Sequence, residues 1–561
     1  MLVGPLATRV IIWPSQASKP GTTTPHTPHA LPLIRIPNPQ TLTSSSTGAA
    51  VGHGRAGHDG GRRTAPWRRP AQDGGDRGVH DVVHLPKPPR VPALQRRAAH
   101  RPPRRPPRRP HQPPPPRPPA QHPRLPVKDA ARTAALSSRW RALWRSTPLV
   151  LVDIHLLPKA QDFGPTPADT PAVTAAVSRI LETHPGPFSC VHLICSRMDA
   201  YKAKLARWVQ LLAAKGVQDL VLVNRPWPLN VPLPASLFTI TTLTRLYLGV
   251  WKLPGTAALR GAAFPNLREL GLCFVEMEHG FVDSLVARSP ALEVLNIVGC
   301  IKCGLRLRLI SQSLRCVQIC GSVLEGIAVV KAPCLERLIL SSPYTPNHGL
   351  CARLRIVDAP KLHTFGYLEP GQVLEVHGTV IMPGIRPSES AMLTGVKILS
   401  FDVRFGVRND VKMVPTFLKC FPNAERLHIV SKKCDEPTGE PLTVKFWEES
   451  GPIESVVSRI NLVTFREFKG DRGEVGFLEF VFQSARALDM VAIFMANPSF
   501  MPFSTDEALV KAQYSARNLA SKSCKKCIIW SSRPEGGDPW SLRVGADFSF
   551  EDPFTVREED S

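Results

Sequence analysis

A recurring phrase constrains the fold of this chain more than any other feature. Five stretches share a proline two residues before a leucine, or before Ala424 in the last of them, and then alternate apolar positions: FPNLRELGL (264–272), SPALEVLNI (289–297), APCLERLIL (332–340), APKLHTFGY (359–367) and FPNAERLHI (421–429). LTRLYLGVW (243–251) and SLRCVQICG (313–321) fit without the proline. The leucine anchors at 243, 267, 292, 314, 335 and 354 are 24, 25, 22, 21 and 19 residues apart. An internal period of this length predicts stacked units rather than one irregular core.

The spacing is that of leucine-rich repeats, and it predicts an α/β solenoid over residues 154–415. Each L-x-x-L-x-L phrase is expected to form a short parallel strand, and the next ~15 residues return on the convex side as helix or loop. One unit cannot bury its own apolar face, so the units must stack. A single α/β domain with similarly spaced strands is the alternative, and the Pro-x-Leu punctuation favours the solenoid. Residues 370–395 do not fit the phase of the repeats.

Two helices are expected ahead of the repeats. Thr170-Pro171 is typical of an N-cap followed by proline at the first helical position, and it precedes an apolar stripe over 173–181. A second stripe over 205–212 is followed by Gly216, which is typical of the end of a helix.

The C-terminal part reads as one more strand–helix–strand unit. Its informative stretches are FLKCFPNAERLHI (417–429), FWEES (446–450) and VVSRINLVTFREFKGDRGEVGFLEFVFQSARALDMVAIF (456–494). We expect a strand from Ile460, a turn at Lys469-Gly470, a helix from Glu474 to Ala487 and a further strand from Leu488. These stretches resemble the FBD domain that follows the repeats of plant F-box proteins. The resemblance covers 416–500 and implies a unit that closes the solenoid and shields its last apolar edge, with 501–561 as a strand-like extension and acidic tail.

The stretch RLPVKDAARTAALSSRWRALWRSTPLVLVD (124–153) carries a leucine–tryptophan stripe on a predicted helix that ends at Pro148. The stripe either packs on the protein's own next domain or forms an interface. The order L-P, then A-x-x-x-L-S-S-R-W-R-x-L-W, resembles the later helices of a plant F-box, so 125–153 is interpreted as a partial F-box. The resemblance implies that the following residues bind a Skp-type adaptor: Leu125, Pro126, Leu136, Trp140, Leu143 and Trp144.

The first helix of an F-box, of the type L-P-x-x-L-L-x-x-I, is missing from the expected place before Leu125. The chain reads RPPRRPPRRPHQPPPPRPPAQHPR there, and proline at nearly every second position prevents an α-helix. This departure puts adaptor binding in question.

Residues 1–124 are expected to be a disordered, Pro/Arg-rich segment. They hold 26 of the 58 prolines and 20 Lys and Arg against 4 Asp and Glu, so much of the net charge of +24 lies there. A basic arm that binds nucleic acid is one interpretation, and an organelle transit peptide is another. The interpretation that we favour is a GC-rich gene translated out of frame, since the F-box begins abruptly after this tract.

Motifs of catalysis are missing from the sequence. It contains no P-loop, H-E-x-x-H or G-x-S-x-G, so we expect no catalytic residue, no cofactor and no metal. The pairs Cys300–Cys303 and Cys524–Cys527 have the spacing of half a zinc site but lie far apart in the chain, and buried free thiols explain them better. Structural, hydrogen-bonded roles are expected for the histidines within strand-like runs: His192, His363 and His428.

The combined resemblance implies a non-enzymatic substrate-recognition subunit of a cullin–RING (SCF) ubiquitin ligase. The region 125–147 would bind the adaptor and through it a cullin, and the strand face of roughly 217–440 would bind an unidentified target protein. A leucine-rich-repeat module that no longer docks the ligase is the main alternative, and a nucleic-acid-binding N-terminal arm is a third. No apolar run reaches the ~18 residues of a membrane span, so we expect no membrane partner. Localisation in the nucleus, the cytoplasm or both is expected, with reduced thiols.

Overall fold

A computed structural model of the protein describes most of the chain from residue 145 onwards. The described residues are 9–10, 34–35, 125–126, 145, 147–157, 166–225, 230–300, 304–341, 352–434, 437–439, 442–499, 503–530 and 541–555. The chain divides into two units, one of Met1–Ala120 with Gln161–Gly164 and one of Gln121–Ala160 with Pro165–Ser561. In the first unit the structure describes β1 (Arg9–Val10) and β2 (Ile34–Arg35), which pair antiparallel. All the other described elements belong to the second unit.

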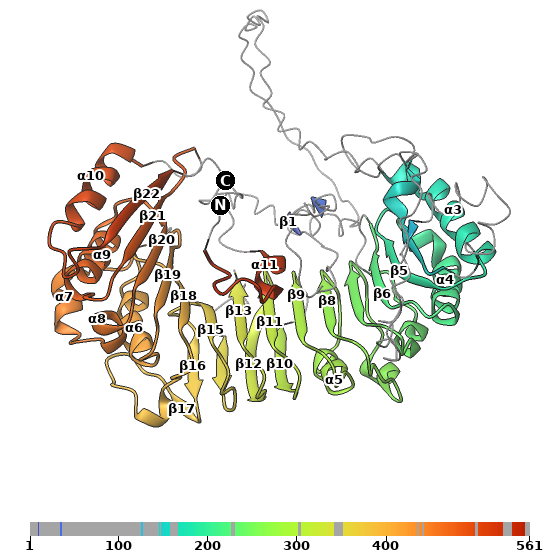
Figure 1. Ribbon diagram of the computed structural model, residues 1–561, viewed down its shortest axis with the longest axis horizontal. Coiled ribbons are helices and arrows are strands. Elements are labelled where there is room, and N and C mark those ends of the chain that lie inside the picture. Colours follow the sequence, from blue (N-terminus) through green and yellow to red (C-terminus); the bar gives the residue numbers. More distant parts are fainter. Residues whose placement is uncertain are drawn as a thin grey trace, which may run out of the picture. The chain divides into compact units, whose positions relative to one another are not determined.

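One sheet of 15 strands runs through the whole second unit, and every pair in it is parallel (Figure 1). The sheet is curved, with its inner face on the side of the short helix α11 (Leu542–Ala546). This is the α/β leucine-rich-repeat solenoid that the period predicted. In spatial order, its strands are β3 (Leu125–Pro126), β4 (Leu149–Val152), β5 (Phe188–Leu193), β6 (Asp219–Val223), β7 (Arg245–Gly249), β8 (Glu269–Cys273), β9 (Val294–Val298), β11 (Cys316–Cys320), β13 (Arg337–Ser341), β15 (Thr364–Leu368), β18 (Ile398–Val403), β19 (Arg426–Ser431), β20 (Leu462–Phe468), β21 (Met490–Met495) and β22 (Lys525–Trp530).

The anchor residues lie two positions before each strand and form the spine of the core. The predicted anchors Leu243, Leu267, Leu292, Leu314 and Leu335 are all fully buried. The sixth predicted anchor, Leu354, is wrong: it lies in a different sheet, and the residue that continues the series is Leu362, two positions before β15. Both leucines are buried, but Leu362 stands in the Pro-x-Leu phrase APKLHTFGY (359–367) and Leu354 does not. The proline was therefore a better guide to the anchor than the alternation of apolar residues.

A second sheet of five strands backs the middle repeats, where the sequence led us to expect helix or loop. Its order is β10 (Leu305–Ile310), β12 (Leu324–Lys331), β14 (Arg353–Ile356), β16 (Val373–Val376) and β17 (Thr379–Val380). All its pairs are parallel except β16–β17. Burial alternates strictly along β10, LRLRLI, which is the period of a half-buried strand. The stretch 370–395 belongs here, which explains why it did not fit the repeat phase.

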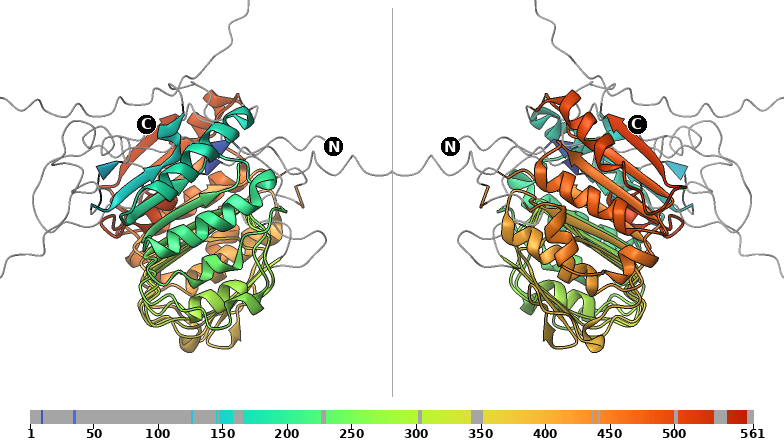
Figure 2. Two further views of the ribbon diagram at one scale, coloured as in Figure 1. Left: turned by 90° about the vertical axis from the view of Figure 1, so that its right-hand side faces the viewer. Right: turned by 90° about the vertical axis from the view of Figure 1, so that its left-hand side faces the viewer.

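Helices cover the outer side of the sheet toward its two ends, as Figure 2 shows in end-on views. Their bounds are α3 (Thr170–Thr183), α4 (Lys202–Ala214), α5 (Phe281–Ala287), α6 (Arg408–Lys419), α7 (Val444–Glu449), α8 (Glu454–Ser458), α9 (Arg472–Ser484) and α10 (Thr505–Ser515). Single 3-10 turns are η2 (Asp153–Leu156), η3 (Pro167–Asp169), η4 (Asp199–Tyr201), η5 (Ala235–Thr239), η6 (Thr256–Leu259) and η7 (Glu389–Ala391). Among the described residues, no helix has the length and apolarity that a membrane span requires.

The two helices predicted ahead of the repeats are confirmed as α3 and α4. Thr170 is the first helical residue rather than the N-cap, because a capping box between Thr166 and Asp169 starts the helical turns earlier. Gly216 follows α4 with a φ of 64°, the left-handed conformation that favours glycine at a helix end.

The C-terminal unit has the predicted strand, turn, helix and strand as β20, Gly470, α9 and β21. The FWEES stretch contributes Trp447, whose ring stacks on Phe480 at 5.4 Å and meets Phe477 edge-on at 5.1 Å. These ring contacts pack α7 against α9. We had expected this unit to close the sheet, but β22 adds a further strand beyond β21 and α10 packs beside α9. β22 lies within 501–561, the stretch that the sequence suggested as a strand-like extension.

Glu474 connects the turn, the helix and the neighbouring repeat in this unit. The side chain is fully buried, and Oε2 accepts the backbone N–H groups of Lys469 (2.9 Å) and Asp471 (3.0 Å). Oε1 accepts the Ser431 hydroxyl of β19 (2.5 Å) and lies 3.2 Å from the Lys469 ammonium. The capping box with Asp471 explains why α9 begins at Arg472, two residues before the predicted start.

We expect Glu474→Ala to lower the free energy of unfolding by about 3 kcal/mol, because it leaves buried donors and an ammonium group without their acceptor. Urea unfolding followed by circular dichroism measures this. Glu479→Ala, on the same helix but with a partly exposed side chain, should change the free energy of unfolding by no more than about 0.5 kcal/mol. Equal effects of the two substitutions would contradict the structural role of Glu474.

A candidate protein-binding surface

The residues predicted to bind an adaptor fall mainly outside the described part of the chain. Leu136, Trp140, Leu143 and Trp144 lie there, so the structure does not test their grouping. Leu125 and Pro126 are described as backbone only: they form β3, which pairs in parallel with β4 at the first edge of the sheet.

The inner face of the sheet, predicted to bind a target, is described in detail. Strand residues alternate between the two faces, so the buried leucines face the helices or the second sheet and the residues between them face inward. The registers align these inward residues in rows across the sheet. One such row runs through Tyr247, Gly271, Asn296 and Gln318, from β7 to β11.

Side chains of this row form a continuous hydrogen-bonded chain. Gln318 donates through Nε2 to Oδ1 of Asn296 (2.8 Å), and Asn296 donates through Nδ2 to the Tyr247 hydroxyl (2.7 Å). Tyr247 in turn donates to Glu269 on the next strand (2.5 Å). Burial raises the pKa of the Glu269 carboxyl, and the bond from Tyr247 opposes that rise. Neighbouring repeats are thus joined by polar side chains on this face as well as by backbone.

A cluster of Cys190, His192 and Asp219 is the one set of potential metal ligands in the part of the chain that the structure describes. Cys190 Sγ is 3.2 Å from His192 Nε2, which is 3.5 Å from Asp219 Oδ1. Arg245 already forms a bidentate ion pair with Asp219. Although burial opposes ionisation, His192 and Arg245 bring the pKa of Asp219 to about 2. A cation would have to displace Arg245, so this cluster fits a polar element of the inner face better than a metal centre. In the cysteine pairs, Cys300 and Cys524 are buried, Cys527 is exposed on β22, and Cys303 lies outside the described residues.

The C-terminal residues Ser541–Thr555, called the tail segment from here on, lie against the inner face in the middle of the sheet (Figure 1). They include α11. Gln318 Nε2 donates to the carbonyl of Leu542 (2.9 Å), and the Cys316 thiol donates to the carbonyl of Gly545 (3.4 Å). The tail segment therefore sits on β11 and extends the polar row described above.

The Arg337 side chain on β13 binds backbone carbonyl groups of the tail segment. Its Nη1 donates to the carbonyls of Val544 (3.4 Å), Gly545 (2.8 Å) and Asp547 (3.1 Å), and its Nη2 donates to that of Phe550. Burial lowers the pKa of Arg337. The last carbonyls of a short helix form the negative end of its dipole, which suits a buried guanidinium.

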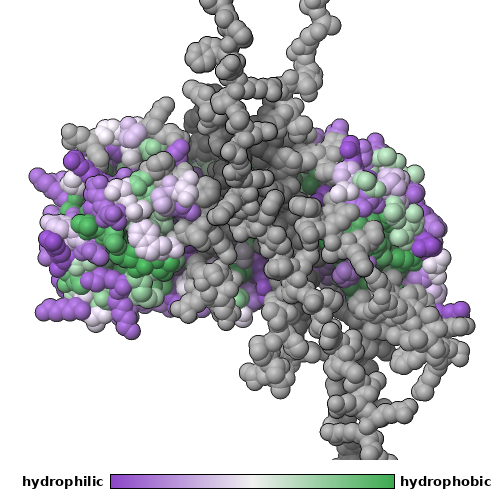
Figure 3. Space-filling model, turned by 90° about the horizontal axis from the view of Figure 1, so that it is seen from above, coloured by the Kyte–Doolittle hydropathy of each residue, from purple (hydrophilic) through white to green (hydrophobic). Residues whose placement is uncertain are grey.

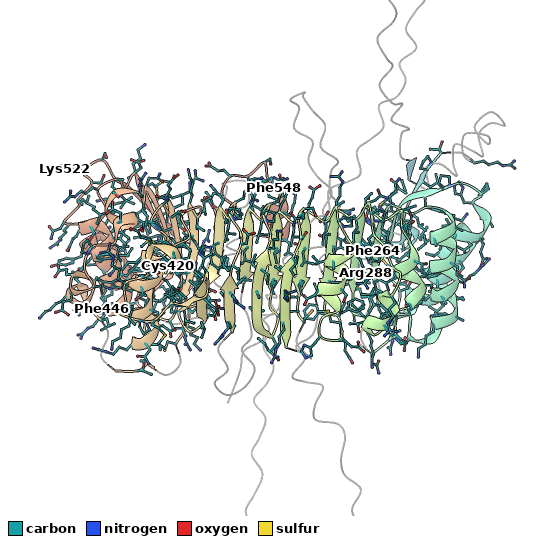
Figure 4. The ribbon with its side chains drawn as sticks, turned by 90° about the horizontal axis from the view of Figure 1, so that it is seen from below. Phe264, Arg288, Cys420, Phe446, Lys522 and Phe548 are labelled. Carbon is teal, nitrogen blue, oxygen red and sulfur yellow. The ribbon has the colours of Figure 1, made fainter. Side chains whose placement is uncertain are left out.

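Two aromatic side chains of the tail segment contact the inner face. The Phe548 ring lies 3.7 Å from the guanidinium carbon of Arg315 and 4.8 Å from that of Arg337, and Figure 4 marks its place over the central strands. Phe554 is 1 % exposed, and its ring packs edge-on against Tyr367 of β15 at 5.0 Å. It also lies 5.3 Å from the ring of His428.

Acidic residues of the tail segment pair with basic residues of β19. Asp552 Oδ2 lies 3.0 Å from His428 Nε2 and 3.6 Å from the Arg426 guanidinium, and Glu551 pairs with Arg426 at 2.8 Å. Burial would raise the pKa of Asp552, but His428 and hydrogen bonds bring it to about 2. His428 Nδ1 contacts the Thr464 hydroxyl (2.6 Å), so this histidine is hydrogen-bonded on both sides, as its strand setting predicted.

Sequence reasoning missed the tail segment and its partners. The face was predicted as a general surface over 217–440, but nothing in the pattern singled out Arg337 or Arg426. The signal that was present is the motif FSFEDPF (548–554), an aromatic and acidic run within the stretch that we interpreted as an acidic tail.

Two family models match the chain, in the order that the sequence suggested. Residues 205–429 match the family described as FBD-associated F-box protein At5g56370, LRR repeats, and residues 448–493 match FBD. Comparisons with curated proteins and with solved structures find no significant match. The two family matches confirm the leucine-rich-repeat and FBD assignments.

Removing the guanidinium of Arg337 should release the tail segment. In Arg337→Ala we expect backbone amides of 541–555 to exchange with deuterium at least about tenfold faster, because hydrogen bonds to a charged donor are lost. Hydrogen–deuterium exchange with mass spectrometry measures this. Arg268→Ala is the matched control, since that arginine pairs with Glu293 at an exposed site. Unchanged exchange in Arg337→Ala would refute this docking role.

The Asp552–His428 pair should make part of the stability depend on pH. A carboxyl with a depressed pKa stabilises the fold above its unfolded pKa, and that contribution is lost as the pH falls through the folded pKa. With a folded value of about 2, Asp552→Asn should cost about 2 kcal/mol at pH 6. The difference from the wild type should shrink between about pH 4 and pH 2, as measured by urea unfolding. A difference that does not change over this range would show that the charge of Asp552 is not responsible.

Proposed function

We propose that this F-box-associated leucine-rich-repeat and FBD protein is the substrate-recognition subunit of a cullin–RING (SCF) ubiquitin ligase. The family matches support a protein-interaction role of F-box type. One observation carries the finer proposal: the stretch 124–153, with the residue order of later F-box helices, lies ahead of the repeats matched over 205–429 and of the FBD match over 448–493.

The division of labour within such a ligase gives this chain no chemistry to perform. Helices of 125–147 would bind a Skp-type adaptor and through it a cullin, and other subunits would transfer ubiquitin. The inner face of the solenoid would hold a target protein. The chain would thus contribute proximity and orientation, which are large terms in any transfer between two bound groups. We propose accordingly that it is not an enzyme and that it acts in the nucleus, the cytoplasm or both.

The inner face has the properties of a recognition surface. Its side chains are arranged in registered rows, and rigid strands hold them in place. Tyr247 and Arg337 belong to residue types that dominate the energetics of protein interfaces.

A separate apolar surface lies at the end of the sheet that contains β20–β22. Figure 3, a view from above, shows it among hydrophilic residues. The large hydrophobic side chains exposed at that end are Met490, Val510, Tyr514, Ile529 and Trp530.

Adaptor binding is tested directly by the tryptophans of the stripe. We expect Trp140→Ala to weaken binding of a purified Skp-type adaptor by at least about thirtyfold, because buried aromatic anchors carry most of the energy of an interface. Pull-down and calorimetry with the full chain measure this. Trp530→Ala is the matched control, since this indole is 51 % exposed at the other end of the sheet. Equal adaptor binding by wild type and Trp140→Ala would exclude this docking mode.

A wild-type chain that does not bind the adaptor at all would favour the alternative, a leucine-rich-repeat module that no longer docks the ligase. The Pro/Arg tract before Leu125 is the observation in favour of this alternative. A second chain, in which a helix of the type L-P-x-x-L-L-x-x-I replaces that tract, separates the two cases. Binding gained only by this second chain would assign the loss to the missing helix.

A further inference from the structure

The tail segment contacts the inner face of the solenoid as a bound peptide would, and it does not form a further repeat. After β22, the last strand of the sheet, the chain returns to strands β11 and β13 in its middle. Gln318 and Leu542, which are hydrogen-bonded, lie 224 residues apart. The described residues of the tail segment add no strand to the sheet.

The solenoid recognises the backbone of the tail segment through side chains. Arg337 donates to four of its carbonyls and Gln318 to a fifth. Carbonyl groups are present in every peptide, so these contacts fix the path of a bound segment without selecting its sequence.

Aromatic and acidic side chains supply the selectivity. Phe548 lies against the guanidinium groups of Arg315 and Arg337, and Phe554 packs against Tyr367. Between these two rings, Glu551 and Asp552 meet Arg426 and His428 as described above. The recognised pattern is thus two aromatic rings that flank an acidic pair.

The floor beneath Phe554 is apolar, unlike the polar row of β7–β11. Phe554 clusters with Ile339, Tyr367 and Ile398, which belong to β13, β15 and β18. An apolar floor next to basic side chains is a site that gains free energy from an aromatic–acidic occupant.

The tail segment is held by contacts that a second peptide could reproduce. Its one helix, α11, has five residues, and its exposed positions include Arg543, Ser549 and Thr555. Glu551 is 71 % exposed at its side chain. An incoming segment with the same pattern could therefore replace these contacts without unfolding any repeat.

We propose that the inner face formed by β11, β13, β15, β18 and β19 is a recognition site for an acidic–aromatic peptide segment of a partner protein. The tail segment occupies this site as the chain's own copy of that ligand. The partner must displace the tail segment to bind. This inference rests on the proposed function in one respect, because it assigns the class of target that the recognition subunit would take.

The test uses the full chain and a fluorescein-labelled peptide with the sequence of the tail segment, residues 541–555. In the wild type the tethered tail segment competes at an effective concentration in the millimolar range, so we expect weak binding. In the variant Asp552→Asn with Phe554→Ala the tethered copy is weakened. Fluorescence anisotropy should then show the peptide binding at least about tenfold more tightly.

Three controls define the site. A peptide that carries the same two changes should bind the variant at least about tenfold more weakly than the unchanged peptide. Adding Arg426→Ala to the variant should weaken binding of the unchanged peptide, whereas adding Arg268→Ala should not. If the double variant does not fold, Glu551→Lys replaces it: the site is exposed, and reversed charge opposite Arg426 should raise peptide binding severalfold over the wild type.

Equal peptide binding by wild type and weakened variants would overturn the proposal, and so would equal binding of the changed peptide. Either result would make the tail segment a permanent part of the fold. No adaptor takes part in this assay. A negative result here therefore leaves the ligase role standing, and a chain that fails only in adaptor binding leaves this recognition site standing.

Discussion

Stacking is the constraint on which the rest of the structure depends, because no single repeat can bury its own anchor. Leu243, Leu267 and Leu292 are fully buried only because the unit on each side covers them. The parallel pairing and the rows of inward-facing side chains both follow from this. Each strand gives one set of side chains to the core and turns the other set to the inner face, so the stacking that builds the core also builds that face.

The sequence predicted the fold well where the signal lies within a few neighbouring residues. The Pro-x-Leu phrases before the strands, the glycine after α4 and the strand–turn–helix order of the FBD domain are local signals in the sequence, and the structure confirms the elements that they predicted. The phase failed at Leu354, because a strand of the second sheet has the same alternation as a strand of the first. The tail segment could not be predicted, since Arg337 binds backbone carbonyls more than 200 residues away and such contacts leave no pattern in the sequence. For the predicted adaptor residues, the stripe from Leu136 to Trp144 lies beyond the described residues and stays a prediction.

Electrostatic pairing organises the inner face from one end to the other. Near β5 and β6, Asp219 forms an ion pair with Arg245 and lies 3.5 Å from His192; near β19, Arg426 and His428 meet acids that come from the tail segment. The first group is complete within the repeats, whereas the second is completed by a segment from outside them. The charged side chains near β5 and β6 thus find their partners within the repeats, whereas those near β19 find theirs in a bound segment. This difference agrees with a protein-interaction role.

The second sheet also sets where the solenoid bends. A helix is about 10 Å wide while neighbouring strands are about 4.8 Å apart, so repeats backed by helices must splay on the outside. Repeats backed by strands have nearly equal widths on both sides and have little reason to splay. The middle of the arc, where β10, β12, β14 and β16 back the first sheet, should therefore be its flattest part. The bending should be concentrated in the repeats that are backed by helices. The tail segment lies over this middle part, where a flat surface would let a peptide contact several successive strands without having to bend with them.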